Sequence, residues 1–521
     1  MSNSFNICPV AHSEVLNQLR TIRSDCSTGT DQIPVKYLKM AADCIASPLT
    51  YIINGFIANH SFPDVWKTVR VSPIPKVASP TELDHYRPIA ILPALSKVYE
   101  RLILNQIIKY IDQHNVLNEN VTGFRKGHAT SSVLLRVRDD ILKAMKKGEI
   151  TLFAFADFSK AFDTVDFAVI IKKLHAIGFS HSSLNWILNY LTGRKQLVQV
   201  NDSQSELADV LFGVPQGSIL GPMLFNLYVN DLQNDFTCRC FQYADDTTVY
   251  RSCTPKNLSQ YVQEMNDNMQ TLETWATESN LLLNENKTKQ MLISTRQMSR
   301  THNLGDITPP LTIKNQSLER VENFKLLGTW LSEDLKWSHH VKELVSSCYG
   351  VLSTLRKIRN MTPQHTKKLL AESLVLSKLN FNDVVCYPLP AYLQKKMQRV
   401  QNAAASFVTN RYCSGKDVLQ LGWLPTLERT QLNLLKHTHR VIYNKTSWPE
   451  YLTLEVYNPG RTLRSNAAQR LSIPLIKGTF QETTANLFND LPQGVRSSAD
   501  LNVFMREVKQ LLKSIALLRL E

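Results

Sequence analysis

The chain has 521 residues, 43% of them hydrophobic and 20% charged, a composition that excludes a disordered or fibrous protein and, at this length, predicts two to four domains or subdomains. Neither a secretory signal nor a run of about 18 apolar residues that could span a bilayer is visible, so no membrane contact is expected. The nine cysteines are scattered and indicate free thiols in an intracellular protein, with nucleus and cytoplasm both open.

The net charge of +14 is unevenly distributed. Residues 341–521 contain 25 lysines and arginines against 12 aspartates and glutamates, whereas residues 201–250 contain one basic and seven acidic residues. Nucleic-acid-binding proteins concentrate positive charge where phosphates lie, and metal sites concentrate carboxylates. The distribution therefore favours a metal site in the middle of the chain and nucleic-acid contact in its last third. Solvated surface charge is the competing interpretation.

The first part of the chain alternates helical and extended segments. Apolar spacing predicts helices over Asp43–His60 and Leu95–His114, and the Pro-rich stretch Val69–Pro80 between them favours extended structure. Glu149–Asp157 is the clearest strand, because it is short, apolar and bounded by an acid. The sequence then predicts a helix over Phe158–Ile177.

The middle of the chain carries further strands, and the remainder is mainly helical. A helix over His181–Thr192 is followed by a predicted strand pair, Gln196–Val200 and Ala208–Phe212. Phe241–Tyr250 favours a β-hairpin with two acids at its tip. Apolar stripes at helical spacing predict later helices over Leu258–Trp275, Val341–Arg359, Leu393–Phe407 and Leu501–Leu520.

Three acids form a candidate metal site. Asp157 ends an apolar strand, and Asp245 and Asp246 occupy the predicted hairpin tip. A buried ionised carboxylate is unfavourable unless it is paired or binds a cation. These acids could converge on two Mg²⁺ ions, with Mn²⁺ as an alternative, and so support an in-line displacement. The competing interpretation is ordinary turn chemistry at Asp245-Asp246 and helix capping by Asp157.

The acids lie in motifs that resemble those of reverse transcriptases. Phe241–Asp246 resembles the tyrosine-x-Asp-Asp box, Phe155–Asp163 the first catalytic box, and Gly213–Ser218 the box between them. Further similar boxes follow in the family's order at Val71–Lys76, Tyr86–Ile89, Gly123–Gly127, Trp275–Thr288 and Leu327–His339. Their residues have the character of non-LTR (LINE-type) retrotransposons of the jockey-like group. The resemblance covers about residues 20–340.

The resemblance implies roles for individual residues. Asp157 and Asp245 would be the main metal ligands with Asp246 beside them, and Lys287 would act as a general acid at the leaving pyrophosphate. Phe162 would lie beneath the incoming sugar and exclude a 2′-hydroxyl. The residues expected at the nucleotide are Lys76, Arg87, Phe162 and Gln216, and those expected at template and primer are Arg125, Lys126 and Gly217. The plainer interpretations are core packing for Phe162 and solvated loops for the others.

The resemblance also implies an α+β fold of the right-hand polymerase type. Its palm would combine an antiparallel sheet with helices, between fingers and a helical thumb. The expected divisions are an N-terminal extension (1–56), fingers and palm (57–335), a thumb (336–410) and a basic C-terminal region (411–521). The expected partners are an RNA template, a DNA primer or target, and dNTPs.

The implied activity is RNA-directed DNA polymerisation by two-metal-ion nucleotidyl transfer. Full-length elements of this kind carry an endonuclease and often a Cys/His knuckle, and neither is visible here, so we expect a truncated element. Two alternatives remain open. One is a catalytically silent, nucleic-acid-binding relic of such an element, and the other is a maturase-like polymerase.

Overall fold

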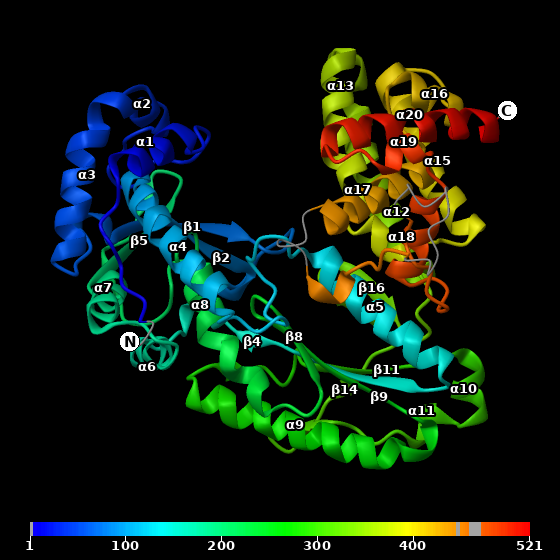
Figure 1. Ribbon diagram of the computed structural model, residues 1–521, viewed down its shortest axis with the longest axis horizontal. Coiled ribbons are helices and arrows are strands. Elements are labelled where there is room, and N and C mark those ends of the chain that lie inside the picture. The colour runs from blue at the N-terminus through cyan, green and yellow to red at the C-terminus, as the bar shows by residue number, and fades with distance from the viewer. Residues whose placement is uncertain (1–3, 444–448, 458–469, 521) are drawn as a thin grey trace.

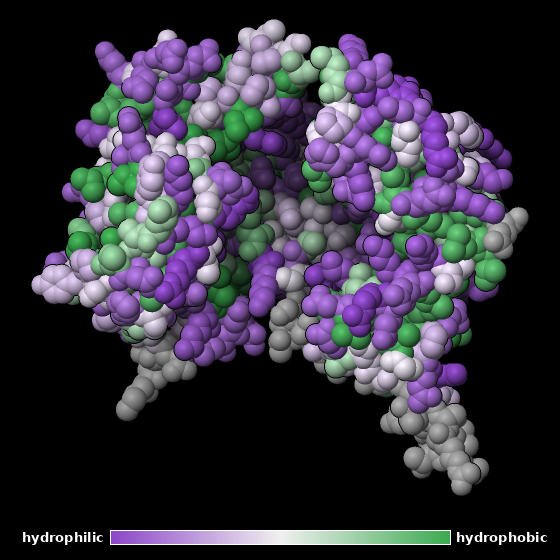
Figure 2. Space-filling model, turned by 90° about the horizontal axis from the view of Figure 1, so that it is seen from above, coloured by the Kyte–Doolittle hydropathy of each residue, from purple (hydrophilic) through white to green (hydrophobic). Residues whose placement is uncertain are grey.

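Two groups of helices stand on either side of an open centre in the computed structural model (Figure 1). The structure describes residues 4–443, 449–457 and 470–520. The N-terminal helices lie on one side and the C-terminal helices on the other, and a sheet with the long helix α9 (Leu258–Glu278) lies below them. Seen from above, the surface is hollowed between the two sides (Figure 2).

The sheet below the centre has five strands, in the order β14 (Glu319–Arg320), β11 (Lys289–Ile293), β3 (Ile150–Ala156), β9 (Asp246–Cys253) and β8 (Arg239–Tyr243). Every pairing in it is antiparallel except that of β11 with β14. All of β3 is buried. The predicted strand and the predicted hairpin are both confirmed, and they are adjacent in this sheet.

The two faces of this sheet pack into different cores. Leu152 and Val249 belong to a core that contains the apolar stripe of α9 and helix α8 (Gly221–Val229). Phe153 and Phe155 belong to a second core shared with α5 (Thr130–Lys146) and the C-terminal helices. Because successive residues of a strand point to opposite faces, β3 is fixed from both sides, and so is the residue that follows it.

A second sheet lies on the N-terminal side. β1 (Thr68–Pro75) pairs antiparallel with β2 (Tyr86–Ile91) and parallel with β5 (Arg194–Val200). β5 pairs antiparallel with β7 (Ala208–Val210), which confirms the predicted strand pair, and the intervening loop adds β6 (Ser203–Gln204). The parallel contact of β1 with β5 joins segments more than a hundred residues apart, which local periodicity does not predict.

Four helices of the N-terminal half confirm the predictions: α3 (Ala42–Ala58), α4 (Ala94–His114), α7 (His181–Leu191) and α9. Helices α1 (His12–Thr21), α2 (Val35–Met40), α5 and α8 were not predicted, and α6 (Phe167–Ala176) covers only part of the range predicted for it. Short elements complete the middle of the chain: α10 (Arg296–Thr301), α11 (Leu304–Ile307), the pair β12 (Thr312–Ile313) and β13 (Gln316–Ser317), and the pair β15 (Asn323–Leu326) and β16 (Thr329–Ser332).

One predicted helix is wrong in its first half. Residues 158–159 form strand β4, which pairs with β10 (Leu282–Leu283), and a 3₁₀ turn occupies Ala161–Asp163. The helix begins only at α6, where the Asp166 carboxylate accepts hydrogen bonds from the backbone N–H groups of Ala168 and Val169. The helix cap is therefore Asp166, and the capping alternative for Asp157 is also wrong.

The C-terminal third is helical. It contains α12 (Ser338–Lys357), α13 (Gln364–Ala371), a π-helical turn leading to α14 (Ser377–Asn380), α15 (Ala391–Thr409), α16 (Gly415–Gln420), α17 (Thr426–Tyr443), α18 (Phe480–Asn489), α19 (Gln493–Arg496) and α20 (Leu501–Leu520). α15 packs against α12 and α17, and α17 packs against α20. No helix in the described ranges has the length and apolar character needed to cross a bilayer. Of the predicted N- and C-terminal divisions, 1–3, 444–448, 458–469 and 521 lie outside the described residues.

Helix α5 ties the C-terminal helices to the sheet. Arg138 donates hydrogen bonds to the Asp139 carboxylate and to the backbone carbonyls of Val385 and Tyr387. Asp139 also accepts a hydrogen bond of 2.8 Å from the backbone N–H of Phe480. Arg138 and Asp139 are each 3% exposed. A buried ion pair of this kind is costly to break singly, so it fixes the docking of α18 and of the turn before α15.

Candidate active site

The structure brings the three candidate acids together at one end of the five-stranded sheet. Ala156 of β3 lies opposite Thr247 of β9, so continuing the antiparallel register by one residue sets Asp157 opposite Asp246. Asp245 belongs to the two-residue turn between β8 and β9. The acids also influence one another electrostatically, because the charges of Asp245 and Asp157 both act on Asp246.

The turn that carries Asp245 is strained and braced. Ala244 has a φ of +56°, a left-handed conformation that is unfavourable for residues with a side chain. Gly123 packs directly against it, since a Cβ at that position would lie 2.5 Å from the Ala244 nitrogen. Thr122 donates to the Gln242 carbonyl from both its backbone N–H and its hydroxyl. Such strain persists only where surrounding contacts hold it, and residues 122–123 supply them.

The acids lie in an electrostatically unfavourable environment. Burial raises the pKa of Asp157, while the charges of Lys287 and, less strongly, Lys76 lower it. Partial removal from water, together with the charges of Asp245 and Asp157, raises the pKa of Asp246 to about 6. The Lys287 Nζ atom is 3.8 Å from the Asp157 carboxylate. Lys287 and the weaker influence of Lys76 do not balance three carboxylates, so the site favours further cations.

A tight turn after β10 holds both Asp157 and Lys287. The Asp157 N–H donates to the Thr288 hydroxyl, and the Asp157 carbonyl accepts from the Asn284 N–H at 2.9 Å. The Lys287 N–H donates to the Asn284 side-chain oxygen, and the Thr288 N–H donates to the Asn284 carbonyl. Asn284 and Thr288 belong to a motif seen in the sequence, but their support of the Asp157 backbone was not predicted.

Gln216 connects the acidic end of the sheet with strand β2. The Gln216 side-chain N–H donates to the Asp163 carboxylate at 2.9 Å. The Gln216 backbone carbonyl accepts from the Ala90 N–H at 2.7 Å. Gly217 follows with a φ of +119°, and a Cβ there would lie 2.4 Å from the Ala90 carbonyl oxygen. Burial raises the pKa of Asp163. Sequence reasoning assigned no role to Asp163, whose only signal was its place at the end of the first catalytic box.

Phe162 lies half-buried in the 3₁₀ turn after β4. Its ring stacks on Phe225 of α8, with ring centroids 4.3 Å apart and an interplanar angle of 22°. Phe124 is a second aromatic neighbour and meets the Phe162 ring edge to face, with ring centroids 6.2 Å apart. Phe162 is therefore partly packed, as the plainer interpretation expected, and partly accessible, as a residue beneath a nucleotide must be. Phe124 was not predicted to take part.

Arg87 and Lys76 lie on the neighbouring hairpin of β1 and β2. Arg87 is exposed on β2, opposite Ile74 of β1. The Lys76 Nζ atom donates to the Asp84 carbonyl at 3.0 Å, and the Asp84 carboxylate pairs with Lys160 at 2.9 Å. The hairpin is thus linked to the segment that contains Phe162. The Asp84–Lys160 pair was also not predicted.

The two basic residues assigned to the template differ in their surroundings. The Arg125 guanidinium donates to the carbonyls of Asn118 and Val121 at 2.8 and 3.0 Å, so it braces its own loop from a half-buried position. Burial lowers the pKa of Arg125. Lys126 is exposed. Of these two, Lys126 has the cationic group that is available to a ligand.

No preformed cluster of three or more His, Cys, Asp and Glu side chains suited to a metal ion exists among the described residues. Mg²⁺ is commonly held by only one or two carboxylates, with water and substrate phosphates supplying the other oxygens. The acidic end of the sheet offers hard carboxylate oxygens and excess negative charge. Its chemistry therefore fits Mg²⁺ that arrives with a phosphate-bearing substrate.

Comparison with known proteins agrees with this geometry. Residues 74–331 match the family described as reverse transcriptase (RNA-dependent DNA polymerase). Three similar proteins from Drosophila melanogaster are the probable RNA-directed DNA polymerases from transposon BS (28% identical) and transposon X-element (29%), and the RNA-directed DNA polymerase from mobile element jockey (27%). The alignments cover 68%, 68% and 66% of this chain.

The same alignments cover only 39%, 39% and 37% of those three relatives, so the chain spans about two fifths of their length. The matched segment contains all three acids, the Gln216 loop, Lys76 and Arg87 of the hairpin, and the turn with Lys287. Through residues 74–331 the chain therefore belongs to the reverse transcriptase (RNA-dependent DNA polymerase) family, with relatives among the polymerases of non-LTR retrotransposons.

Proposed function

We propose that the chain extends a DNA 3′-end on an RNA template, using dNTPs and two-metal-ion nucleotidyl transfer. The observation that carries the proposal is the convergence of Asp157, Asp245 and Asp246 at one end of the sheet, within the reverse transcriptase segment. Charge repulsion among the acids supports it, because carboxylates with raised pKa values are stabilised by divalent cations.

Mg²⁺ is the proposed metal, with Mn²⁺ as an alternative, and Asp157, Asp245 and Asp246 would hold it. When bound, two such ions activate the primer 3′-hydroxyl and neutralise the leaving pyrophosphate. Lys287 lies beside Asp157, where an ammonium group can donate a proton to the leaving group. The turn of Asn284 and Thr288 would hold the acid and the lysine in register with each other.

The nucleotide would enter beside the β1–β2 hairpin. Arg87 presents an exposed guanidinium suited to phosphate oxygens. The charge of Lys76 acts on Asp157, where it lowers the pKa of that carboxyl group. Phe162 would lie beneath the sugar, and Gln216, oriented by Asp163, would border the base pair. Gly217 allows the backbone to approach its neighbours closely. Arg125 would support the template loop, and Lys126 would contact the template backbone.

The architecture corresponds to a right hand in this proposal. The five-stranded sheet with α8 and α9 is the palm, the β1–β5 sheet and its neighbours are the fingers, and α12–α15 form the thumb. We retain the divisions 1–56, 57–335, 336–410 and 411–521. The hollow between the two sides (Figure 2) would accept the template–primer duplex, with the basic C-terminal third on one wall.

Primer extension tests the proposal. The full chain is incubated with poly(rA)/oligo(dT), Mg²⁺ and dTTP, alongside Asp245→Asn and the matched control Asp235→Asn, which changes an exposed acid outside the site. Losing a metal ligand removes several kcal/mol of transition-state stabilisation, so Asp245→Asn should extend roughly 10³-fold more slowly. The control should match the wild type. A folded wild type that binds the duplex without extending it would instead be a catalytically silent relic.

A further inference from the structure

Phe124 is an exposed aromatic residue in a backbone conformation that such residues rarely adopt. Its φ is +59° and its side chain is 56% exposed. A bulky residue in the left-handed region is a genuine outlier, and an exposed phenyl ring gains little from burial. Local folding therefore gives no reason for a phenylalanine here. Strain of this kind clusters at functional sites.

The backbone around Phe124 is held on both sides. The Gly123 carbonyl accepts a hydrogen bond of 2.6 Å from the side chain of Asn226, which is fully buried on α8. On the other side, Arg125 bonds to the carbonyls of Asn118 and Val121. The Gly123 backbone also abuts Ala244 of the acidic turn. These contacts fix the direction in which the Phe124 ring projects.

The ring projects onto Phe162. Phe225, with no exposed surface, supports one side of Phe162 by stacking, and Phe124 closes on it edge to face with an interplanar angle of 87°. Edge-to-face and offset-stacked pairs are the favoured aromatic geometries. Removal of the Phe124 ring would leave Phe162 with the Phe225 stack but without its edge-to-face partner, so the Phe162 ring would be held by fewer contacts.

We propose that Phe124 is a positioning residue that holds Phe162 in place and thereby sets the preference for deoxyribose over ribose. The inference rests on the proposed function, in which Phe162 lies beneath the sugar. A rigid ring excludes a 2′-hydroxyl more strongly than a ring that can move aside, because clashes in a mobile site relax at little cost. Phe124 would act through Phe162 and would not itself touch the nucleotide.

The test measures kcat/KM for dUTP and for UTP on poly(rA)/oligo(dT), since these nucleotides differ only in the 2′-hydroxyl. Phe124→Asn removes the ring but suits the left-handed backbone, and Phe124→Tyr keeps the ring. An aromatic pair contributes about 0.5–1.5 kcal/mol, so Phe124→Asn should lower the dUTP/UTP ratio roughly three- to tenfold. In Phe124→Asn, kcat/KM for dUTP should change by less than about twofold. Phe124→Tyr should keep the dUTP/UTP ratio of the wild type.

A double-mutant comparison separates positioning from direct contact. Phe162→Ala should abolish the preference, and adding Phe124→Asn should change it no further, because both substitutions act through one ring. Equal losses with dUTP and UTP in Phe124→Asn would overturn the inference and point to contact with the nucleic acid. Phe124→Gly, which also relaxes the backbone, should reproduce Phe124→Asn. A wild type without extension would refute the proposed function itself, whereas an unchanged ratio in Phe162→Ala would refute only the role of Phe162 beneath the sugar.

Discussion

Lys287 can serve the proposed reaction either as a proton donor or as a fixed positive charge. Its ammonium group is 3.8 Å from Asp157 and 69% exposed. Lysine can lose its proton near physiological pH in a suitable site, whereas arginine stays charged. If Lys287 donates the proton, Lys287→Arg and Lys287→Gln should both lower kcat by about 10²-fold with little change in KM for dNTP.

Single-turnover primer extension at saturating dNTP checks this prediction, because it isolates the chemical step from nucleotide binding and product release. Lys172→Gln, which changes an exposed lysine on α6, is the matched control. Near-complete activity in Lys287→Arg would show that a positive charge suffices.

Gly217 is a position where a single methyl group should be destabilising. An added Cβ would lie 2.4 Å from the Ala90 carbonyl oxygen, and the φ of +119° is unfavourable for any other residue. We expect Gly217→Ala to lower the free energy of unfolding by about 2–4 kcal/mol. Urea unfolding measures it. Gly350→Ala is the control, because a Cβ there meets nothing within 4 Å and Gly350 lies within α12, so it should stabilise by about 0.5–1 kcal/mol. Equal changes in the free energy of unfolding in the two variants would contradict the close approach of Gly217 to the Ala90 carbonyl.

At the scale of elements, the sequence predicted several of the longer helices and strands, such as α4, α9 and β3, because their apolar spacing survives tertiary packing. Helix α20 has the predicted limits of Leu501–Leu520. The failure at residues 158–166 has a physical cause: β4 pairs with β10, more than a hundred residues away, and the helix begins only where Asp166 caps it. Local periodicity contains neither contact.

The candidate site was predictable to a similar extent. The acids stood out at a strand end and a hairpin tip, and the resemblance of their motifs to those of reverse transcriptases gave them their role. Their supports could not be predicted in the same way. The contacts of Asp157 with Thr288, of Gln216 with Ala90 and of Phe124 with Phe162 join distant segments. Only the three-dimensional arrangement brings them together.

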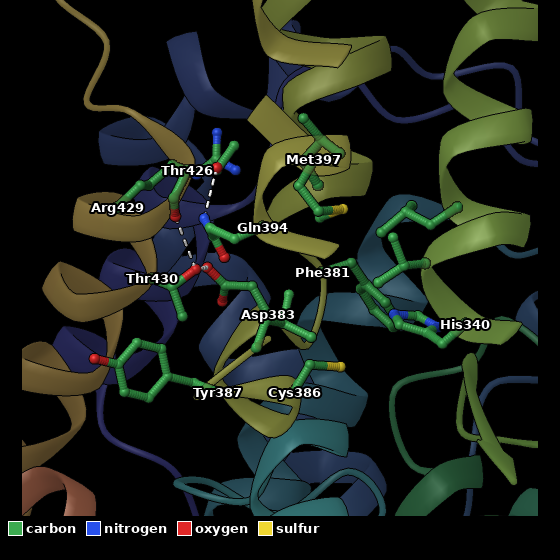
Figure 3. A pocket seen from close by; sticks show the side chains of 14 residues that line it. His340, Phe381, Asp383, Cys386, Tyr387, Gln394, Met397, Thr426, Arg429 and Thr430 are labelled. Atoms are coloured by element: carbon green, nitrogen blue, oxygen red, sulfur yellow. Dashed lines mark hydrogen bonds between the residues drawn. The ribbon is translucent and has the colours of Figure 1, made fainter. Parts of the chain in front are cut away.

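Between α12, α15 and α17, a pocket is lined by several titratable side chains, among them His340 and Asp383, whose pKa values shift in opposite directions (Figure 3). His340, 8% exposed, accepts a weak hydrogen bond from the Trp330 N–H on its ring nitrogen. Burial, followed by the charges of His339 and Lys325, lowers the pKa of His340 to about 4. Asp383 accepts hydrogen bonds from Thr430 and Asn433, and burial raises its pKa to about 6.

His340 should make the fold sensitive to acid. The pKa of His340 is about 4 in the folded chain and about 6.5 in the unfolded chain. Its contribution to the free energy of unfolding is therefore fully present above pH 6.5 and is lost as the pH falls through 4. Between pH 7.5 and 5 it should amount to roughly 2 kcal/mol. Asp383 acts in the opposite direction, because its folded pKa is raised and its contribution is lost as the pH rises through 6.

Comparison of variants separates the two groups. Urea unfolding measures how far the free energy of unfolding falls between pH 7.5 and pH 5, which is called the acid loss here. The acid loss should be smaller in His340→Gln, whose amide oxygen can still accept a hydrogen bond from Trp330. It should be larger in Asp383→Asn, since that substitution removes the opposing contribution. An acid loss in His340→Gln equal to that of the wild type would contradict a neutral buried His340.

At the scale of the whole molecule, the excess positive charge resides in residues 341–521, across the central hollow from much of the reverse transcriptase segment. Within it, Lys436 and Arg440 of α17 line a cavity with Ser131 at the start of α5. Neither forms an ion pair or hydrogen bond among the described residues. After burial, their charges help lower the pKa of His437 to about 4, which indicates a positive potential beside them. Asp383 lines the same cavity, and burial raises the pKa of its carboxyl group to about 6.

This potential should appear in the salt dependence of binding to an RNA–DNA duplex. Each phosphate contact contributes about 0.7–0.9 to the slope of log K against log salt, so the double variant Lys436→Gln/Arg440→Gln should reduce the slope by roughly 1.5. Fluorescence anisotropy with a labelled primer–template over about 50 to 300 mM KCl measures it. Lys36→Gln/Lys172→Gln removes the same charge from the N-terminal side and should leave the slope unchanged. Equal reductions in both pairs would mean that net charge alone attracts the duplex, whereas a selective reduction would assign duplex contact to the wall formed by α17 and α5.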